Sequence, residues 1–335
     1  MALLDSQARP LRALRVSVTD RCNFRCPYCM PRETFGEDFG FLGRQEILSF
    51  EEINRLVRIF VDLGVVKVRL TGGEPLLRRD LPLLVEGLRG IPGLRETALT
   101  TNGSLLAGLA RPLREAGLSR LTVSLDSLDP ARFQASSDSR VPLEQVLDGL
   151  QAARAAGFQG IKLNCVLRRG FNESDILPLA GYARDQGFTL RFIEFMDVGT
   201  RNGWRLDSVV PALEVAETIG RRWPVERVPG PAPNCVAQHW KYRDGAGEVG
   251  LIASVTEPFC AGCDRARLSA DGCLYTCLFA ATGLDLKAPL RAGASDRELT
   301  ALVQARWHVR DDRYSERRTE ATAALPRPEM YRMGG

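Results

Sequence analysis

The sequence predicts an α/β fold in which a parallel sheet curves into a barrel or half-barrel, followed by a smaller extension that carries cysteines. Six short β-like runs alternate with helical patterns, which is typical of parallel sheets. Polar side chains repeat along one face of most of these runs, and the pattern changes from about residue 200 onward. A chain of 335 residues, 44% of them hydrophobic, is long enough for about two such units.

The predicted strands are 14–19, 66–71, 96–102, 120–126, 160–167 and 189–195. Between the first two, apolar residues recur at helical spacing, with a capping box at Ser49 and Glu52 and a stop at Gly64. Further helical patterns lie near 80–90, 105–116, 142–156 and 173–186. The alternation of strands and helices favours parallel strand pairing.

One face of the predicted strands is polar, whereas parallel strands covered on both sides usually read as continuous apolar runs. Arg15, Ser17 and Thr19 share one such face, and Thr122, Ser124 and Asp126 share another. An antiparallel sheet with one wet face would show the same alternation. The helices between the strands favour instead a barrel or half-barrel whose concave side holds a polar ligand.

Five cations on these faces are expected to converge in one cavity. Buried cations without partners are costly, so an anionic ligand such as a polyphosphate would neutralise them. These residues are Arg15, Lys67, Arg69, Lys162 and Arg191.

The second part of the chain begins with a Pro-rich connection, "VERVPGPAPNC" over 225–235. Short strands are expected over 236–283, and the polar end "RPEMYRMGG" reads as a flexible tail. The expected division is 1–200 for the barrel and 201–335 for the extension.

The composition narrows the class of protein. A net charge of +4 gives no argument for nucleic acid, and no apolar run reaches the roughly 20 residues that span a membrane. The first fifteen residues lack the features of a signal peptide, so we expect a soluble, cytoplasmic protein. In that compartment nine clustered cysteines favour metal binding over disulfides.

The first cysteine group, Cys22, Cys26 and Cys29, has the spacing C-x3-C-x2-C. A structural zinc site uses four ligands, whereas three thiolates on a four-iron cube leave one iron open for chemistry. Together with "TGGEP" at 71–75, about 45 residues later, this spacing resembles the radical S-adenosylmethionine (SAM) superfamily. The resemblance implies that SAM is the fourth ligand of a 4Fe–4S cluster. It further implies SAM contacts from Tyr28, Gly73, Ser124 and Met196.

The second group comprises Cys260, Cys263, Cys273 and Cys277. By spacing alone it fits a four-ligand zinc knuckle or a fully ligated cluster, and Cys235 and His239 lie near enough in sequence to serve a zinc.

Several motifs together resemble the MoaA family of GTP 3′,8-cyclases, which act in molybdenum cofactor biosynthesis. They are "TDRCNFRCPYCM", "VRLTGGEPLLR", "LTTNG", "VSLDSLDP", "RFIEFMDVG", the segment from Phe259 to Phe279, and the Gly334-Gly335 pair. The resemblance implies an α/β fold: an incomplete (βα)6 radical SAM barrel with a C-terminal, cluster-binding α+β extension.

The same resemblance implies a second 4Fe–4S cluster on Cys260, Cys263 and Cys277, again with an open iron. This iron would bind the guanine of GTP. Cys273 departs from the family pattern and is interpreted as a bystander. The implied GTP contacts are Arg15, Lys67, Arg69, Thr100, Lys162, Arg191, Arg265 and Arg267. Thr100, at the end of its strand, is also near the implied SAM site.

The implied reaction begins when the reduced first cluster cleaves SAM. The deoxyadenosyl radical takes the 3′ hydrogen of GTP, and the ribose radical closes a ring on carbon 8 of guanine. The product is (8S)-3′,8-cyclo-7,8-dihydroguanosine 5′-triphosphate. The resemblance implies a reductant such as flavodoxin or ferredoxin, a homodimer, and transfer of the product to cyclic pyranopterin monophosphate synthase, with no nucleic acid or membrane partner.

Two other functions fit parts of the sequence. A radical SAM enzyme that modifies a peptide would share the first cysteine group, but such enzymes usually carry more C-terminal cysteines. An Arg-rich zinc module that binds RNA would leave the first cysteine group and "TGGEP" unexplained. The sequence leaves unassigned the roles of Cys165, Cys235 and Cys273, and whether the Gly-Gly tail enters the active site.

Overall fold

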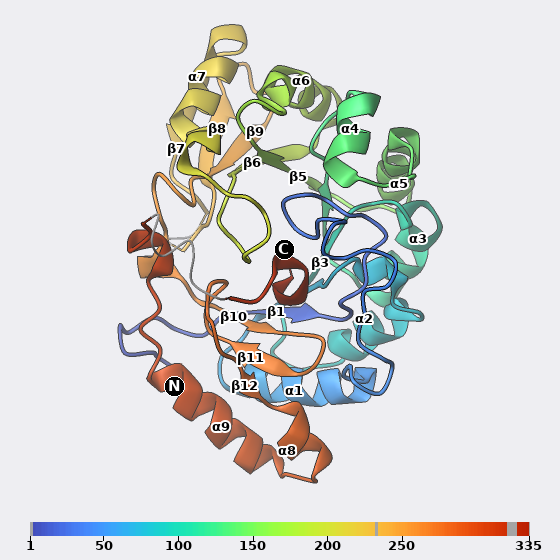
Figure 1. Ribbon diagram of the computed structural model, residues 1–335, viewed down its shortest axis with the longest axis vertical. Helices are drawn as coiled ribbons and strands as arrows, with labels where there is room; N and C mark the ends of the chain where they lie inside the picture. Colours follow the sequence, from blue (N-terminus) through green and yellow to red (C-terminus); the bar gives the residue numbers. More distant parts are fainter. Residues whose placement is uncertain (1–2, 232–233, 320–326, 335) are drawn as a thin grey trace.

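The computed structural model describes residues 3–231, 234–319 and 327–334. Six parallel strands pair in sequence order at the centre of a curved sheet (Figure 1). They are β1 (Ala13–Ser17), β2 (Lys67–Thr71), β3 (Glu96–Thr101), β4 (Arg120–Ser124), β5 (Lys162–Leu167) and β6 (Thr189–Glu194). The predicted strands are therefore confirmed to within about two residues at each end, and the antiparallel alternative is wrong for this part of the sheet.

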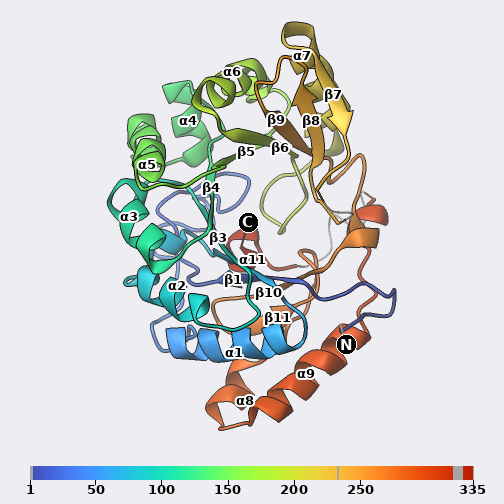
Figure 2. The ribbon, with the colours of Figure 1, turned by 180° about the vertical axis from the view of Figure 1, so that it is seen from behind.

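Helices cover the convex side of the six strands, as the view from behind shows (Figure 2). They are α1 (Phe50–Asp62), α2 (Leu81–Arg89), α3 (Leu106–Ala116), α4 (Pro130–Ser137), α5 (Leu143–Ala155) and α6 (Ile176–Gln186). The predicted capping box is present, because Ser49 Oγ accepts from the Glu52 amide and the Glu52 carboxylate accepts from the Ser49 amide. Gly64, with φ of +113°, follows the end of α1.

The alternation along each strand separates the apolar core from the concave face. In β5, Leu163, Cys165 and Leu167 are buried, whereas Lys162 and Asn164 are only partly buried. Cys165 thus belongs to the apolar core, where its thiol lies 3.6 Å from the Asp126 carbonyl oxygen. The expected polar concave face exists, and apolar side chains pack between sheet and helices.

The extension adds strands to both edges of the barrel sheet. β10 (Arg265–Leu268) pairs in parallel with β1, and β9 (Glu248–Ile252) pairs in parallel with β6. Antiparallel strands continue each edge: β7 (Val225–Val228), β8 (Gln238–Tyr242), β11 (Cys273–Tyr275) and β12 (Leu284–Asp285). The strands of residues 225–285 therefore extend the barrel sheet at both edges instead of forming a separate sheet.

The remaining helices also belong to the second part of the chain. They are α7 (Ala212–Arg222), α8 (Lys287–Arg291), α9 (Asp296–His308) and α11 (Met330–Met333). The part of the chain that the structure describes also has short 3₁₀ segments: η1 (Pro75–Leu77), η2 (Glu173–Asp175), η3 (Leu206–Ser208), η4 (Cys260–Gly262) and η5 (Tyr314–Glu316). Helices α4, α7, α8, α9 and α11 were not predicted from the sequence, although Asp129 before Pro130 and Ser295 before Glu298 are ordinary helix starts.

The carboxylate of Glu194, at the end of β6, connects the barrel to the extension. One oxygen accepts from the Ala212 amide (2.9 Å) and the Thr256 hydroxyl (2.5 Å). The other accepts from the amides of Val255 (2.7 Å) and Thr256 (2.9 Å). Glu194 is 3% exposed, so this buried carboxylate fixes the start of α7 and the turn after β9.

Among the described residues, no helix is both long and apolar enough to cross a membrane.

Candidate active site

The loop after β1 carries the first cysteine group. The amides of Cys29 and Met30 both donate to the Cys26 carbonyl oxygen, at 2.9 and 2.8 Å. The Arg25 guanidinium donates to the carbonyl oxygens of Cys22 (2.7 Å), Phe24 (2.9 Å) and Phe35 (2.7 Å). The loop therefore has a defined shape in which all three thiols are free and partly buried.

These three thiols interact with one another electrostatically. Burial, followed by the charges of Cys29 and Cys22, raises the pKa of Cys26 well above its ordinary value. Burial and the nearby Glu74 raise the pKa of Cys22 to about 12. Thiolates form in such a place only with a compensating cation, and a metal that displaces the thiol protons provides it. The donor set therefore fits an iron–sulfur cluster.

The backbone of the "TGGEP" segment forms hydrogen bonds with the backbone at the start of this loop. The Gly73 amide donates to the Thr19 carbonyl oxygen (2.9 Å), and the Glu74 amide donates to that of Arg21 (2.7 Å). A Cβ at Gly73 would overlap the Arg21 carbonyl, and Gly72 has φ of +146°. Only glycine permits this close approach of two backbones.

Asp126, which was not among the predicted site residues, anchors Tyr28, a predicted SAM contact. The Tyr28 hydroxyl donates to Asp126 Oδ2 (2.8 Å), and Asp126 Oδ1 accepts from the Val166 amide (2.8 Å). Burial raises the pKa of Asp126 to about 6. Asp126 follows β4 and lies on the polar face that the alternation in the sequence predicted. That alternation is the sequence feature from which a role for Asp126 in the site could have been predicted. Ser124 ends β4 and is partly buried, and Met196 lies beyond β6.

The predicted cations of the strands do lie together on the concave face. The Arg69 Nη1 atom donates to the hydroxyls of Thr100 (3.1 Å) and Thr122 (3.2 Å). Arg191 Nε donates to Asn164 Oδ1 at 2.9 Å. Burial, followed by the charges of Arg267, Arg69, Arg265 and Arg191, lowers the pKa of Arg15 well below its ordinary value.

This group of cations is largely uncompensated. Burial and neighbouring cations lower the pKa of Lys162 to about 8 and of Arg191 to about 9. Among the described residues, the ion pairs include none from Arg15, Arg69, Lys162, Arg191, Arg265 or Arg267 to an acidic side chain. Lys67, the first residue of β2, differs because its ammonium lies 2.6 Å from the carboxylate of Glu96, the first residue of β3. The concave face is therefore suited to a highly charged anion.

The second cysteine group lies where η4 leads into β10. The Cys263 amide donates to the Cys260 carbonyl oxygen (3.1 Å), and Arg265 Nη2 lies 3.3 Å from the Cys263 sulfur. Burial opposes ionisation, but the charges of Arg265 and Arg310 lower the pKa of Cys263 to about 7. Burial raises the pKa of Cys277 to about 12, with contributions from Asp312, Cys263 and Cys260. Cys277 is thus grouped with Cys260 and Cys263.

Cys273 lies apart from this group, in β11, opposite Asp285 of β12. Its pKa is raised by burial and by the charges of Asp271 and Asp285. Cys235 lies beside His239, whose Nδ1 is 3.1 Å from Glu248. In the described ranges, no three side chains of His, Cys, Asp or Glu converge on a single ion. A preformed zinc site is therefore absent there, whereas the thiols of a four-iron cube are more widely spaced because each binds a different iron.

The segment before the last residue enters the arc of strands, where the label C stands in Figures 1 and 2. The Arg267 guanidinium donates to the carbonyl oxygens of Met333 (2.9 Å) and Gly334. The Ser17 hydroxyl donates to the carbonyl oxygen of Arg332 at 3.2 Å. The expectation of a flexible tail is wrong for 327–334, because buried partners hold it; Gly335 lies outside the described residues.

Aromatic contacts tie this segment to the first cysteine loop. The ring of Tyr331 meets those of Phe35, Phe39 and Phe41 edge-on, with centroids 4.9, 6.4 and 6.5 Å away. The Glu329 carboxylate accepts from the Thr200 amide (3.0 Å) and hydroxyl (2.9 Å). The segment therefore packs against the first cysteine loop and is held by Arg267 of β10, the strand that follows Cys260 and Cys263.

Comparison with known proteins adds independent information. The family model described as Radical SAM superfamily matches residues 16–183, and the one described as Molybdenum Cofactor Synthesis C matches 188–316. A GTP 3′,8-cyclase from Acidothermus cellulolyticus is 56% identical over 94% of this chain and 88% of its own length. One from Xanthomonas axonopodis pv. citri is 52% identical over 99% and 98%, and one from Staphylococcus carnosus is 44% identical over 99% and 97%.

Among solved structures, Streptococcus suis SuiB bound to S-adenosylmethionine matches with a TM-score of 0.60. The match covers 90% of this chain and 67% of that one at 12% identity. A likeness at this identity supports the radical SAM fold alone.

Proposed function

The chain belongs to the GTP 3′,8-cyclase family of the radical SAM superfamily, and from this we propose how its residues perform the reaction. Membership makes it a radical SAM enzyme of molybdenum cofactor biosynthesis, with GTP as substrate and with SAM and a 4Fe–4S cluster as cofactors. The residues that serve each of these, and a second cluster, are our assignments.

Cys22, Cys26 and Cys29 hold the first cluster, and Tyr28, Gly73, Ser124 and Met196 surround SAM. The cluster supplies the electron that converts SAM into the radical which takes the 3′ hydrogen of GTP. Because the Gly73 amide already donates to Thr19, its carbonyl oxygen is the group that accepts from the SAM amine. The Tyr28–Asp126 hydrogen bond fixes the ring of Tyr28 against this site.

Cys260, Cys263 and Cys277 would hold the second cluster, which would supply a binding site for the guanine. Arg265 and Arg267 lie on β10 beside it and contact GTP. Cys273 takes no part, since it lies in β11 opposite Asp285 of β12 and its main electrostatic partners are Asp271 and Asp285. With both ends of the nucleotide held, ribose and base become a near-attack pair, which accounts for much of the rate that positioning provides.

The uncompensated cations of the concave face are the observation that carries this assignment. Arg15, Arg69, Lys162 and Arg191 lie near one another on the concave face, and a triphosphate would neutralise them. Two further residues contact GTP: Thr100, whose hydroxyl accepts from Arg69, and Lys67, at the start of β2. The Tyr331-bearing segment excludes water and stray hydrogen donors from the radical.

Other features follow from the same assignment. A small reductant such as flavodoxin or ferredoxin supplies electrons, and the product passes to cyclic pyranopterin monophosphate synthase. The enzyme acts as a homodimer in the cytoplasm, where thiolates and clusters stay reduced. The barrel comprises residues 1–200 and the extension residues 201–335.

The test is an anaerobic turnover experiment with protein reconstituted with iron and sulfide. Reduced protein receives SAM with or without GTP, and mass spectrometry quantifies 5′-deoxyadenosine and cyclised nucleotide. Deoxyadenosine that depends on GTP, formed with a new nucleotide, supports the assignment. Deoxyadenosine that is indifferent to GTP would instead favour the peptide-modifying alternative.

Two variants, measured in the same experiment, distinguish the roles of the two cysteine groups. Cys26→Ala should abolish deoxyadenosine, whereas Cys277→Ala should keep slow SAM cleavage and abolish the cyclised product. If Cys277→Ala still forms the product, the second cluster does not bind the substrate.

A further inference from the structure

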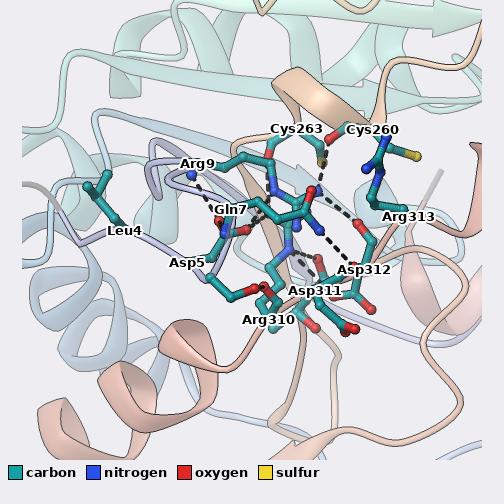
Figure 3. A network of polar contacts seen from close by, with 12 residues as sticks. Leu4, Asp5, Gln7, Arg9, Cys260, Cys263, Arg310, Asp311, Asp312 and Arg313 are labelled. Carbon is teal, nitrogen blue, oxygen red and sulfur yellow. Dashed lines mark hydrogen bonds and ion pairs between the residues drawn. The ribbon is translucent and has the colours of Figure 1, made fainter.

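A buried ion network lies beside the second cysteine group and joins segments far apart in the chain (Figure 3). Asp5 Oδ2 lies 2.7 Å from Arg9 Nε and 2.9 Å from Arg310 Nη1. The side chains of Asp5, Arg9 and Arg310 are 0%, 3% and 1% exposed. One carboxylate thus holds two guanidinium groups in a place that water does not reach.

Both guanidinium groups also donate hydrogen bonds to the cysteine loop. Arg9 Nη1 donates to the Cys260 carbonyl oxygen at 2.9 Å. Arg310 Nη1 donates to the Cys263 carbonyl oxygen at 2.8 Å. Arg310 Nε donates to the carbonyl oxygen of Thr276, which precedes Cys277, at 3.0 Å. Carbonyls at or next to all three thiols are therefore held by two arginines.

The network is itself fixed on its other sides. The Arg310 guanidinium lies 4.6 Å from the Trp307 ring centre, and Trp307 Nε1 donates to the Arg9 carbonyl oxygen at 3.4 Å. Arg9 Nη1 also donates to the carbonyl oxygen of Asp312 at 2.8 Å. The segment before β1 and the segment after α9 thus form a rigid support.

A role in packing alone would explain the ion pairs. It would not explain why further N–H groups of both arginines point at backbone carbonyls of the cysteine loop. A guanidinium offers its N–H groups in a fixed fork, so two carbonyls bound to one group keep a set separation. Arg310 fixes the separation of the Cys263 and Thr276 carbonyls in this way. Asp5 binds both Arg310 and Arg9, and it thereby fixes the position of the Cys260 carbonyl relative to the other two. The three thiols are thereby held at set positions before any cluster binds.

We propose that Asp5, Arg9 and Arg310 are positioning residues for the second cluster, which they retain by fixing the backbone of its three cysteine ligands. This proposal rests on the proposed function, which places a cluster on Cys260, Cys263 and Cys277. It assigns to the segment before the barrel a role in the chemistry of the extension.

The test uses the full chain with Cys22→Ala, Cys26→Ala and Cys29→Ala, so that bound iron reports the second cluster alone. In this parent, Arg310→Lys keeps a positive charge but cannot hold Asp5, Cys263 and Thr276 at once. Loss of iron to a chelator should be about 10–100-fold faster, the usual cost of removing a partner that orients metal ligands. The electron paramagnetic resonance signal of the reduced cluster should also broaden.

Arg184→Lys is the matched control. Like Arg310, Arg184 pairs with an aspartate, Asp244, at 2.7 Å and lies over an aromatic ring, 4.2 Å from the Tyr242 ring centre; its side chain is 13% exposed. Iron loss and the signal should not change in this variant. If Arg310→Lys fails to fold, Arg9→Lys is measured in its place; of the three carbonyls on the cysteine loop, it releases only that of Cys260.

A converse chain with Cys260→Ala, Cys263→Ala and Cys277→Ala reports the first cluster. There, Arg310→Lys should leave the rate of iron loss unchanged. Equal acceleration in both chains, or no acceleration in the first, overturns the proposal. A parent chain that assembles no second cluster at all overturns the proposed function instead.

Discussion

Arg267, in the middle of β10, holds Gly334 through a hydrogen bond from its guanidinium to the glycine carbonyl oxygen. The same Nη1 atom donates to the carbonyl oxygen of Met333 at 2.9 Å. Gly334 has φ of +71°, and its Cα lies against Ser17 of β1 and Thr71 of β2. A residue expected to bind substrate thus also fixes the C-terminal segment within the barrel.

Gly334→Ala should lower cyclase activity because an added Cβ would overlap Thr71 and because alanine disfavours a positive φ. Displacement of the segment by about 1 Å would cost on the order of 100-fold in kcat/KM. Gly170→Ala is the control, since Gly170 has φ of +73° with open space around it. Activity in the control should match the unaltered protein; equal losses in the two variants would contradict a local effect at Gly334.

Arg191→Met should weaken GTP binding by about tenfold or more, as expected when a charged hydrogen-bond donor worth roughly 1.5–3 kcal/mol is lost. The melting temperature of the ligand-free protein should stay constant or rise, because one of several mutually repelling buried cations is gone. Arg184→Met should show the reverse, with lower stability and unchanged GTP binding. Calorimetric titration and thermal unfolding measure both, and a large loss of stability in Arg191→Met would refute the argument.

The titration of Lys162 gives a pH dependence of stability. Burial and nearby cations lower its pKa from 10.5 to about 8, so between about pH 8 and 10.5 the folded state binds fewer protons than the unfolded state. Stability should therefore rise with pH across that window, and this contribution should be constant below it. Lys162→Met should remove this rise from the pH profile of unfolding.

GTP should have the opposite effect on this proton. A bound triphosphate favours the charged amine, so binding at pH 9 takes up a proton and affinity falls as pH increases. Titration calorimetry in two buffers of different ionisation enthalpy measures the uptake. Equal proton uptake in the unaltered protein and in Lys162→Met would assign it to another group.

Cys277→Ser and Cys273→Ser should differ in iron content. Cys277 interacts with Cys260 and Cys263, whereas Cys273 faces Asp285 across two strands. Cys277→Ser should lose about half of the bound iron if each of two clusters holds four atoms. Cys273→Ser should lose none; iron loss there with retention in Cys277→Ser would reverse the assignment of ligands.

Glu194→Gln should destabilise the fold by roughly 2–3 kcal/mol. Glu194 accepts from three amides and a hydroxyl, and an amide NH₂ in place of one oxygen leaves buried donors facing each other. Chemical denaturation measures the change. The exposed Glu217→Gln, on the adjacent helix α7, should stay within about 0.5 kcal/mol of the unaltered protein.

Local patterns in the sequence determined much of this protein. The alternation within 162–167 predicted a strand with one polar face, and Ser49 with Glu52 predicted the start of α1; both are confirmed. The spacing of Cys22, Cys26 and Cys29, with "TGGEP", predicted the superfamily. These features depend on neighbours within a few residues, where strand and helix periodicity fix which side chains share a face.

Tertiary structure alone decided what distant segments bring together. Arg9 meets Cys260 across 251 positions of sequence, and Ser17 meets Arg332 across 315. The anchoring of Tyr28 by Asp126 and the entry of Gly334 into the barrel also come from packing. Spacing along the chain carries no information on such contacts, because the burial of apolar faces brings the segments together and only then are their polar groups paired.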